Sequence, residues 1–118
     1  MERLTIYHNP RCSKSRAALA ILQAHEFPLR VVEYLKEPPT RAELAGLRKK
    51  LGLPPAEWIR RTEAEYKQAG LGPHSSEEQL LDAMATHPVL IERPIVVRGN
   101  RAVVGRPPER VLELVEAK

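Results

Sequence analysis

The chain contains few of the residues that several common functions need. Among its 118 residues are one cysteine, one tryptophan and one phenylalanine, and aromatic residues make up 4% of the total. A single cysteine excludes an internal disulfide framework and, with only four histidines, gives no basis for a structural zinc site, so we expect no bound metal. Aromatic residues are too few to form stacking platforms for single-stranded nucleic acid, so we expect no nucleic-acid partner.

The sequence also lacks a long hydrophobic run. No stretch approaches the length of a membrane-spanning helix, and the first residues begin a strand pattern instead of a signal peptide. We therefore expect a cytoplasmic protein with no membrane partner. The length is enough for one hydrophobic core, so residues 1–118 are predicted to form a single domain. A net charge of +4, with basic residues scattered among acidic ones, fits a small anionic substrate.

The first third of the chain carries a strand, a helix and a second strand. Apolar periodicity predicts strands at residues 3–7 and 29–34 and a helix at about 14–25 between them. Two strands joined by a helix form a βαβ unit, so these strands should be parallel.

The middle of the chain is predicted to be helical. Thr40 and Glu43 have the spacing of a capping box at the start of one helix. Two prolines begin a short helix over residues 54–60, and a third helix extends from about residue 75 to residue 86. The stretch 62–72 between them is polar, with Tyr66 and Leu71 as its main anchors, and no helix is predicted there.

The last third of the chain predicts a hairpin followed by a helix. Residues 95–97 and 102–104 are expected to be strands joined by a turn with Gly-Asn at its centre, and prolines then start a helix over 107–115. The complete order, β-α-β, a helical insertion over about 40–86, then β-β-α, is the α/β layout of a thioredoxin-like core. In that fold a cis-proline faces the reactive thiol, so we predict a cis bond at Arg93–Pro94.

Cys12 lies where the first strand gives way to the first helix. Free backbone N–H groups and the helix dipole favour an anion at that position, and Arg11, Lys14 and Arg16 add positive charge nearby. These features lower the pKa of a thiol and favour the nucleophilic thiolate. Ser15 stands where a C-x-x-C motif has its second cysteine, so any redox cycle must take a second thiol from another molecule.

A thiolate that attacks an oxyanion needs fixed positive donors, and arginine suits this role because its planar fork holds two oxygens. The predicted topology allows Arg93, Arg106 and either Arg60 or Arg61 to approach Cys12. Spacing alone does not choose between Arg60 and Arg61. Each arginine also has an ordinary alternative role as a solvated surface charge.

Two polar residues flank the cysteine. His8 is a candidate to tune the thiolate or donate to the substrate, and Ser15 is a candidate to donate its hydroxyl to the Cys12 sulfur. Their alternative roles are structural: a hydrogen bond at the end of a strand for His8 and a plain first-turn helix residue for Ser15.

Four motifs together resemble the ArsC family, the glutathione- and glutaredoxin-coupled arsenate reductases of bacteria. The resemblance extends over nearly the whole chain. It points to the shorter branch of the family for two reasons: Lys14 stands where other members have a small residue, and the chain stops soon after its last helix. The motifs are His8-Asn9-Pro10-Arg11-Cys12-Ser13-Lys14-Ser15-Arg16, residues 34–35 with 38–44, residues 93–97, and Gly105-Arg106-Pro107.

The resemblance implies a mechanism and a set of roles. Cys12 would be the nucleophile, with His8 and Ser15 supporting it. Arsenate would be the substrate, glutathione a co-substrate and glutaredoxin the partner that resolves the glutathionylated intermediate, with no bound cofactor; we expect a monomer. The family match selects Arg60 over Arg61. The oxyanion would then be held by three arginines: Arg60, Arg93 and Arg106.

Two other functions compete with this one. C-x-x-S also resembles the motif of monothiol glutaredoxins, which favours a general glutathione-dependent thiol oxidoreductase, but a disulfide substrate does not need three arginines. An Spx-like, non-catalytic regulator shares the predicted fold but usually carries a C-x-x-C switch, which Ser15 removes here.

Overall fold

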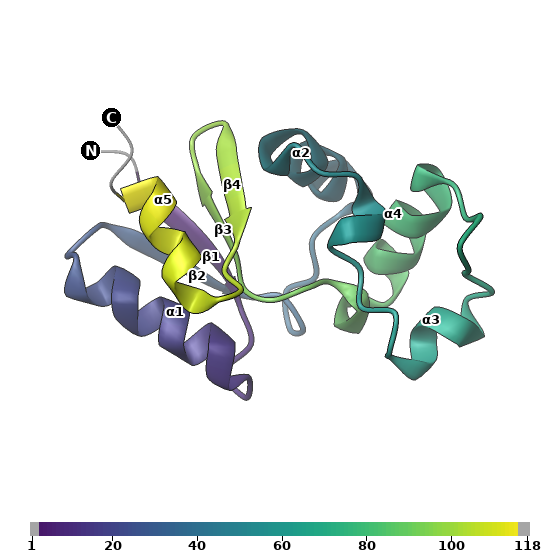
Figure 1. The fold of residues 1–118 in the computed structure, drawn as a ribbon, viewed down its shortest axis with the longest axis horizontal. Helices are drawn as coiled ribbons and strands as arrows, with labels where there is room; N and C mark the ends of the chain where they lie inside the picture. The colour runs from purple at the N-terminus through teal and green to yellow at the C-terminus, as the bar shows by residue number, and fades with distance from the viewer. Residues whose placement is uncertain (1–2, 116–118) are drawn as a thin grey trace. The chain divides into compact units, whose positions relative to one another are not determined.

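The structure is a computed structural model that describes residues 3–115. It divides into two compact units, and Figure 1 shows the order of their elements along the chain. Residues up to Glu37 together with those from Arg93 onward form the first, which we call the core unit. Pro38–Glu92 form the second, which we call the helical unit.

The core unit is built on a four-stranded sheet in the order β2-β1-β3-β4. Its strands are β1 (Leu4–His8), β2 (Leu29–Glu33), β3 (Ile95–Arg98) and β4 (Arg101–Val104). β1 and β2 are parallel, as the βαβ pattern predicts, whereas β3 is antiparallel to both β1 and β4. The predicted thioredoxin-like α/β fold is thereby confirmed.

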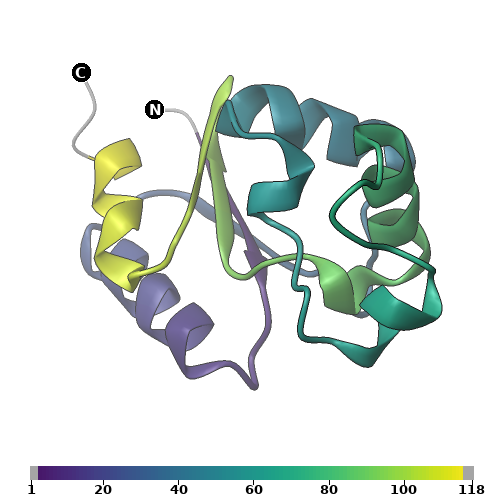
Figure 2. The same cartoon turned by 45° about the vertical axis from the view of Figure 1, so that its right-hand side comes forward.

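Two helices lie side by side on one face of this sheet (Figures 1 and 2). They are α1 (Ser13–Ala24) and α5 (Leu112–Val115), and α5 continues directly from the 3₁₀ turn η3 (Pro108–Val111). The predicted last helix is therefore present, but its first turn is 3₁₀. Apolar residues from the sheet and these helices form the core of the unit: Leu4, Ile6, Ala18, Leu22, Val96, Val103, Val111 and Leu114.

The helical unit holds three helices and two 3₁₀ turns. They are α2 (Arg41–Leu51), η1 (Pro55–Glu57), α3 (Ala64–Gln68), α4 (Glu77–Thr86) and η2 (Pro88–Leu90). α4 contacts α2 and both 3₁₀ turns. The large side chains buried in the unit include Leu44, Trp58, Met84, Leu90 and Ile91.

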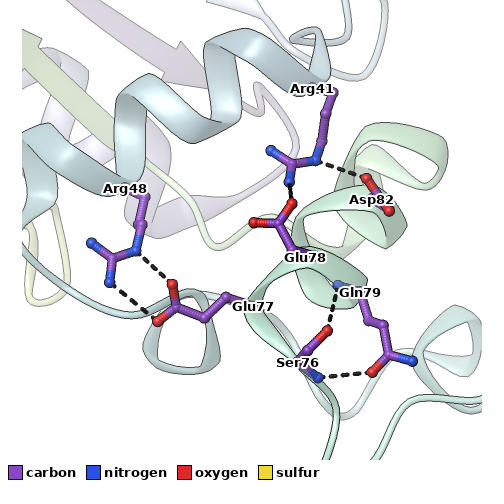
Figure 3. Close-up of polar contacts among 7 residues, drawn as sticks. All are labelled: Arg41, Arg48, Ser76, Glu77, Glu78, Gln79 and Asp82. Atoms are coloured by element: carbon purple, nitrogen blue, oxygen red, sulfur yellow. Dashed lines mark hydrogen bonds and ion pairs between the residues drawn. The ribbon is translucent and has the colours of Figure 1, made fainter.

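Capping residues fix where the two longer helices of this unit begin. The predicted capping box is confirmed: the Thr40 hydroxyl accepts from the Glu43 N–H, and the Glu43 carboxylate accepts from the Thr40 N–H. Ser76 and Gln79 form a second capping box at α4, seen in Figure 3.

Exposed ion pairs also join α2 to α4 (Figure 3). Arg48 is paired with Glu77, with its Nε 2.8 Å from a carboxylate oxygen. Arg41 contacts both Glu78 and Asp82, the latter at 2.7 Å. Because exposed pairs are screened and cost side-chain entropy, they contribute little stability, and the buried apolar residues hold the unit together.

The structure corrects the prediction in two places within this unit. The short helix predicted over 54–60 ends at Glu57, because Ile59 forms an isolated β-bridge with Ile91. The stretch 62–72 contains α3, which was not predicted. α3 buries none of its residues, so its sequence carries no apolar period to reveal it.

Within residues 3–115, no helix is both long enough and apolar enough to cross a membrane.

Candidate active site around Cys12

The turn between β1 and α1 is held by local hydrogen bonds. The Cys12 N–H donates to the Asn9 carbonyl at 3.0 Å, and the Arg11 N–H donates to the Asn9 side-chain oxygen at 3.0 Å. The Arg16 guanidinium donates back to the Pro10 carbonyl at 3.0 Å. These bonds place Cys12 as the residue that caps the N-terminus of α1, with its side chain half-buried.

The surroundings of Cys12 favour its thiolate. Partial burial acts to raise the pKa of the thiol, but the backbone N–H groups of Ser15 and Lys14 donate to the sulfur and lower it. The Arg93 guanidinium adds both its charge and a hydrogen bond to the sulfur. The lowering effects outweigh burial, so the pKa of Cys12 lies below its ordinary value.

His8 and Ser15 form a buried pair behind the turn. Side chains alternate along a strand, so His8 lies on the same face of the sheet as Leu4 and Ile6, the face that α1 covers. Ser15 is on the buried side of α1, and its Oγ lies 2.6 Å from His8 Nδ1. The same oxygen accepts from the Asn9 N–H at 3.0 Å.

The pair differs from the sequence-based expectation in one respect. The Ser15 hydroxyl contacts His8 and Asn9, whereas the hydrogen bond from Ser15 to the Cys12 sulfur comes from its backbone N–H. The pKa of His8 is lowered, first because burial disfavours the imidazolium; the Glu33 carboxylate opposes this effect and the Arg16 charge adds to it. A neutral His8 is therefore favoured at neutral pH.

Arg93 and Arg106 lie together at the start of β3. The Arg106 Nη1 donates to the Arg93 carbonyl at 3.4 Å, and the Gly105 N–H donates to the Pro94 carbonyl at 2.8 Å. The predicted cis bond at Arg93–Pro94 is confirmed, and a second one, not predicted, joins Arg106 to Pro107. The structure thus brings Cys12, Arg93 and Arg106 into one neighbourhood of the core unit.

Arg60 and Arg61 belong to the helical unit. Arg60 follows Ile59, and its guanidinium pairs with Glu63 at 2.7 Å and donates to the Val89 carbonyl at 3.3 Å. Arg61 donates to the Ala56 carbonyl at 3.0 Å. The local contacts of Arg60 are therefore an ion pair and a backbone carbonyl.

One residue of the turn was missed from the sequence. Asn9 supports the cysteine with its backbone carbonyl, its side-chain oxygen and its N–H. The signal was present, because an Asn-Pro dipeptide favours the start of a turn and asparagine side chains accept from the backbone N–H two residues on. Within the described part of the chain, no group of three or more His, Cys, Asp or Glu side chains is placed to hold a metal ion.

Gly105 packs closely against Pro94, at a position where a larger side chain does not fit. A Cβ at residue 105 would lie 2.9 Å from the Pro94 ring and 3.0 Å from a Val111 methyl group. We expect Gly105→Ala to lower the free energy of unfolding by about 1–3 kcal/mol, the usual cost of overpacking, and to displace the Pro94 ring. Urea denaturation would measure the loss.

Gly46→Ala is the matched control, since a Cβ at that position in α2 would meet nothing within 4 Å. It should stabilise the protein by roughly 0.5–1 kcal/mol, because alanine favours a helix more than glycine does. Equal effects of the two substitutions would contradict the close contact at Gly105.

The sheet order and the cysteine at the β1–α1 turn define a thioredoxin-like protein with one candidate reactive thiol. A model of the ArsC family matches residues 7–114, and the chain belongs to this family. The arsenate reductase of Neisseria meningitidis serogroup A is 46% identical over 113 residues, covering 94% of this chain and 97% of that protein. The uncharacterized protein YfgD of Escherichia coli K12 is 48% identical, covering 97% and 98%. A solved structure of an arsenate reductase from Vibrio cholerae has a TM-score of 0.90 and 46% identity, covering 95% and 97%.

Proposed function

We propose that this protein reduces arsenate to arsenite with electrons from glutathione and glutaredoxin. The observation that carries the proposal is the contact of the Arg93 guanidinium with the Cys12 sulfur, in a turn that lowers the pKa of this thiol. Membership of the ArsC family, with relatives named arsenate reductase, supports the choice of oxyanion.

In the first step the Cys12 thiolate attacks arsenic. A sulfur–arsenic bond forms, one arsenic–oxygen bond breaks, and the oxygen leaves as water after taking up protons; arsenic stays at oxidation state V. The guanidinium groups of Arg93 and Arg106 hold the anion and offset its charge. Arg60 is proposed as the third arginine from the family match, and it would exchange Glu63 for the anion.

The later steps need thiols from other molecules, because Cys12 is the only cysteine of the chain. The glutathione thiol replaces a second arsenic-bound oxygen, which leaves as water. A glutaredoxin thiolate then attacks the glutathione sulfur, and a disulfide forms between them. The sulfur–arsenic bond to glutathione breaks with its electron pair left on arsenic, which becomes arsenic(III). Water finally releases arsenite and restores the Cys12 thiol.

His8 and Ser15 are proposed to support the thiolate. Their 2.6 Å contact holds the first turn of α1 against the end of β1, and this keeps the Ser15 N–H directed at the sulfur. A neutral His8 also avoids placing a buried positive charge that would have to be desolvated.

The test is a coupled assay in which arsenate-dependent oxidation of NADPH is followed with glutathione, glutaredoxin and glutathione reductase. We expect turnover that falls to background when arsenate, glutathione or glutaredoxin is omitted. If the protein reduces a mixed disulfide of glutathione but does not reduce arsenate, the result would instead favour a general thiol oxidoreductase. Absence of both activities, with co-purification of RNA polymerase, would favour a non-catalytic regulator.

A further inference from the structure

A cavity of about 190 Å³ opens in the core unit beside the cysteine turn. One wall is formed by residues 8–11, the stretch that leads directly to Cys12. The other wall comes from the end of β2 and the residues after it, Glu33, Leu35 and Lys36. The roles proposed above for the cysteine and the arginines leave this cavity unused.

The sheet order places the cavity on a definite side of the turn. β1 and β2 are parallel, with His8 opposite Glu33, so their carboxyl ends share one edge of the sheet. β3 is antiparallel to β1, with Tyr7 opposite Ile95, so β3 starts at that same edge but on the other side of β1. Arg93, just before β3, thus approaches the turn from one side, and the cavity lies on the opposite side, next to β2.

The charges that line the cavity form a definite pattern. Arg11 and Lys36 are cationic and Glu33 is anionic, and the Lys36 ammonium lies 3.5 Å from the Glu33 carboxylate. The Lys36 side chain is 80% exposed, so this pair is weakly held and open to exchange with a ligand. Leu35, 47% exposed, adds an apolar surface at the same place.

Glutathione carries the complementary set of charges at neutral pH: two carboxylates and one ammonium. Its γ-glutamyl end is a zwitterion, with a carboxylate and an ammonium on the same carbon. An adjacent cation and anion, as in Lys36 and Glu33, match that zwitterion. The glycine carboxylate at the other end of the tripeptide needs one further cation, and Arg11 provides it on the wall nearest Cys12.

We propose that this cavity is the glutathione-binding site of the protein. The γ-glutamyl zwitterion pairs with Lys36 and Glu33, the glycine carboxylate pairs with Arg11, and the central cysteine residue of glutathione faces the turn. The inference rests on the proposed function, because glutathione is the co-substrate there. Its thiol then approaches arsenic bound to Cys12 from the side opposite Arg93, which leaves the oxyanion contacts in place during the exchange of oxygen for sulfur.

Binding is tested first without any reaction. S-methylglutathione, which has no free thiol, is titrated into the isotope-labelled protein, and the backbone amide signals are followed by NMR. We expect the largest shifts at the cavity walls, Leu35 and Lys36 among them. Lys36→Ala should raise the dissociation constant about fivefold, the effect of losing one exposed ion pair. Lys50→Ala, at an exposed position of α2, is the matched control and should leave the constant unchanged.

Kinetics then separate this site from the arsenate site. We expect Lys36→Ala and Arg11→Ala to raise the KM for glutathione, and Lys36→Ala to leave the KM for arsenate unchanged. Glutathione esterified at its glycine carboxylate should lose affinity for the wild-type protein, and Arg11→Ala should remove most of that difference. This pairing of one residue with one ligand group tests the orientation directly.

The outcomes distinguish the two proposals. Arsenate turnover with an unchanged glutathione KM in both variants would overturn the glutathione site while leaving the proposed function intact. Binding of S-methylglutathione at the cavity without arsenate turnover would support the site and overturn arsenate as the substrate. An unchanged glutathione KM with a raised KM for glutaredoxin would assign this surface to the partner protein and overturn the proposal.

Discussion

Cys12→Ser is expected to abolish arsenate-dependent NADPH oxidation, with a loss of roughly a thousandfold or more. A serine hydroxyl stays protonated at neutral pH and is a poor nucleophile, whereas the Cys12 thiol, with its lowered pKa, supplies a thiolate. No other cysteine in the chain can replace it. The coupled assay measures the loss directly.

The first control for Cys12→Ser is a check that the variant keeps the wild-type fold. Cysteine and serine have nearly the same shape and Cys12 is half-buried, so the far-ultraviolet circular dichroism and the urea midpoint should match those of the wild type. Ser13→Ala, at the exposed neighbouring position, should keep most of the activity. Residual turnover near the wild-type rate in Cys12→Ser would contradict the proposed nucleophilic role of this residue.

Arg93→Ala is expected to have the second largest effect, because it removes the contact with the Cys12 sulfur and the proposed contact with the anion. Loss of one positioned donor to a charged reaction centre typically costs about 10²–10³ in rate, so we expect a fall in kcat/KM for arsenate of that order. Arg93→Lys should recover part of it, since the charge returns without the planar fork.

The same substitution should move the pH dependence of the thiol. The wild-type thiol reacts as a thiolate, so its alkylation rate with iodoacetamide should rise with pH through a midpoint below the ordinary cysteine pKa. In Arg93→Ala the pKa should increase, because the guanidinium charge and hydrogen bond no longer stabilise the thiolate. The midpoint therefore shifts to higher pH, and the rate at neutral pH falls.

Arg110→Ala provides the comparison for Arg93. Arg110 is an exposed arginine of the core unit that pairs with Glu113 at 3.2 Å. Its removal changes the net charge by the same amount without touching the turn, so the alkylation midpoint and the arsenate kinetics should stay close to those of the wild type. Equal shifts in the two variants would attribute the effect to overall charge and contradict a specific contact between Arg93 and Cys12.

Most of the core unit was predictable because its signals are local. The alternation in β1, the Gly-Asn turn after β3 and the prolines before η3 each act within a few residues, and the corresponding elements are present. The helical unit was less predictable where an element has no buried residues or where its end depends on a distant partner. α3 buries no side chain, and the end of η1 depends on Ile59 pairing with the distant Ile91.

The candidate site divides in the same way. The sequence by itself determined that Cys12 caps a helix beside basic residues, because the strand-to-helix turn is encoded in residues 8–16. It also excluded an internal second thiol. The roles proposed for the site residues all remain predictions: Cys12, His8, Ser15, Arg60, Arg93 and Arg106.

Only the tertiary structure decided which groups meet the sulfur. Arg93 reaches Cys12 because β3 starts at the edge of the sheet where β1 ends. Ser15 turns its hydroxyl to His8 because one faces inward from α1 and the other from β1. These contacts join residues from different elements, so strand register and helix packing set them, and no local sequence pattern specifies either contact.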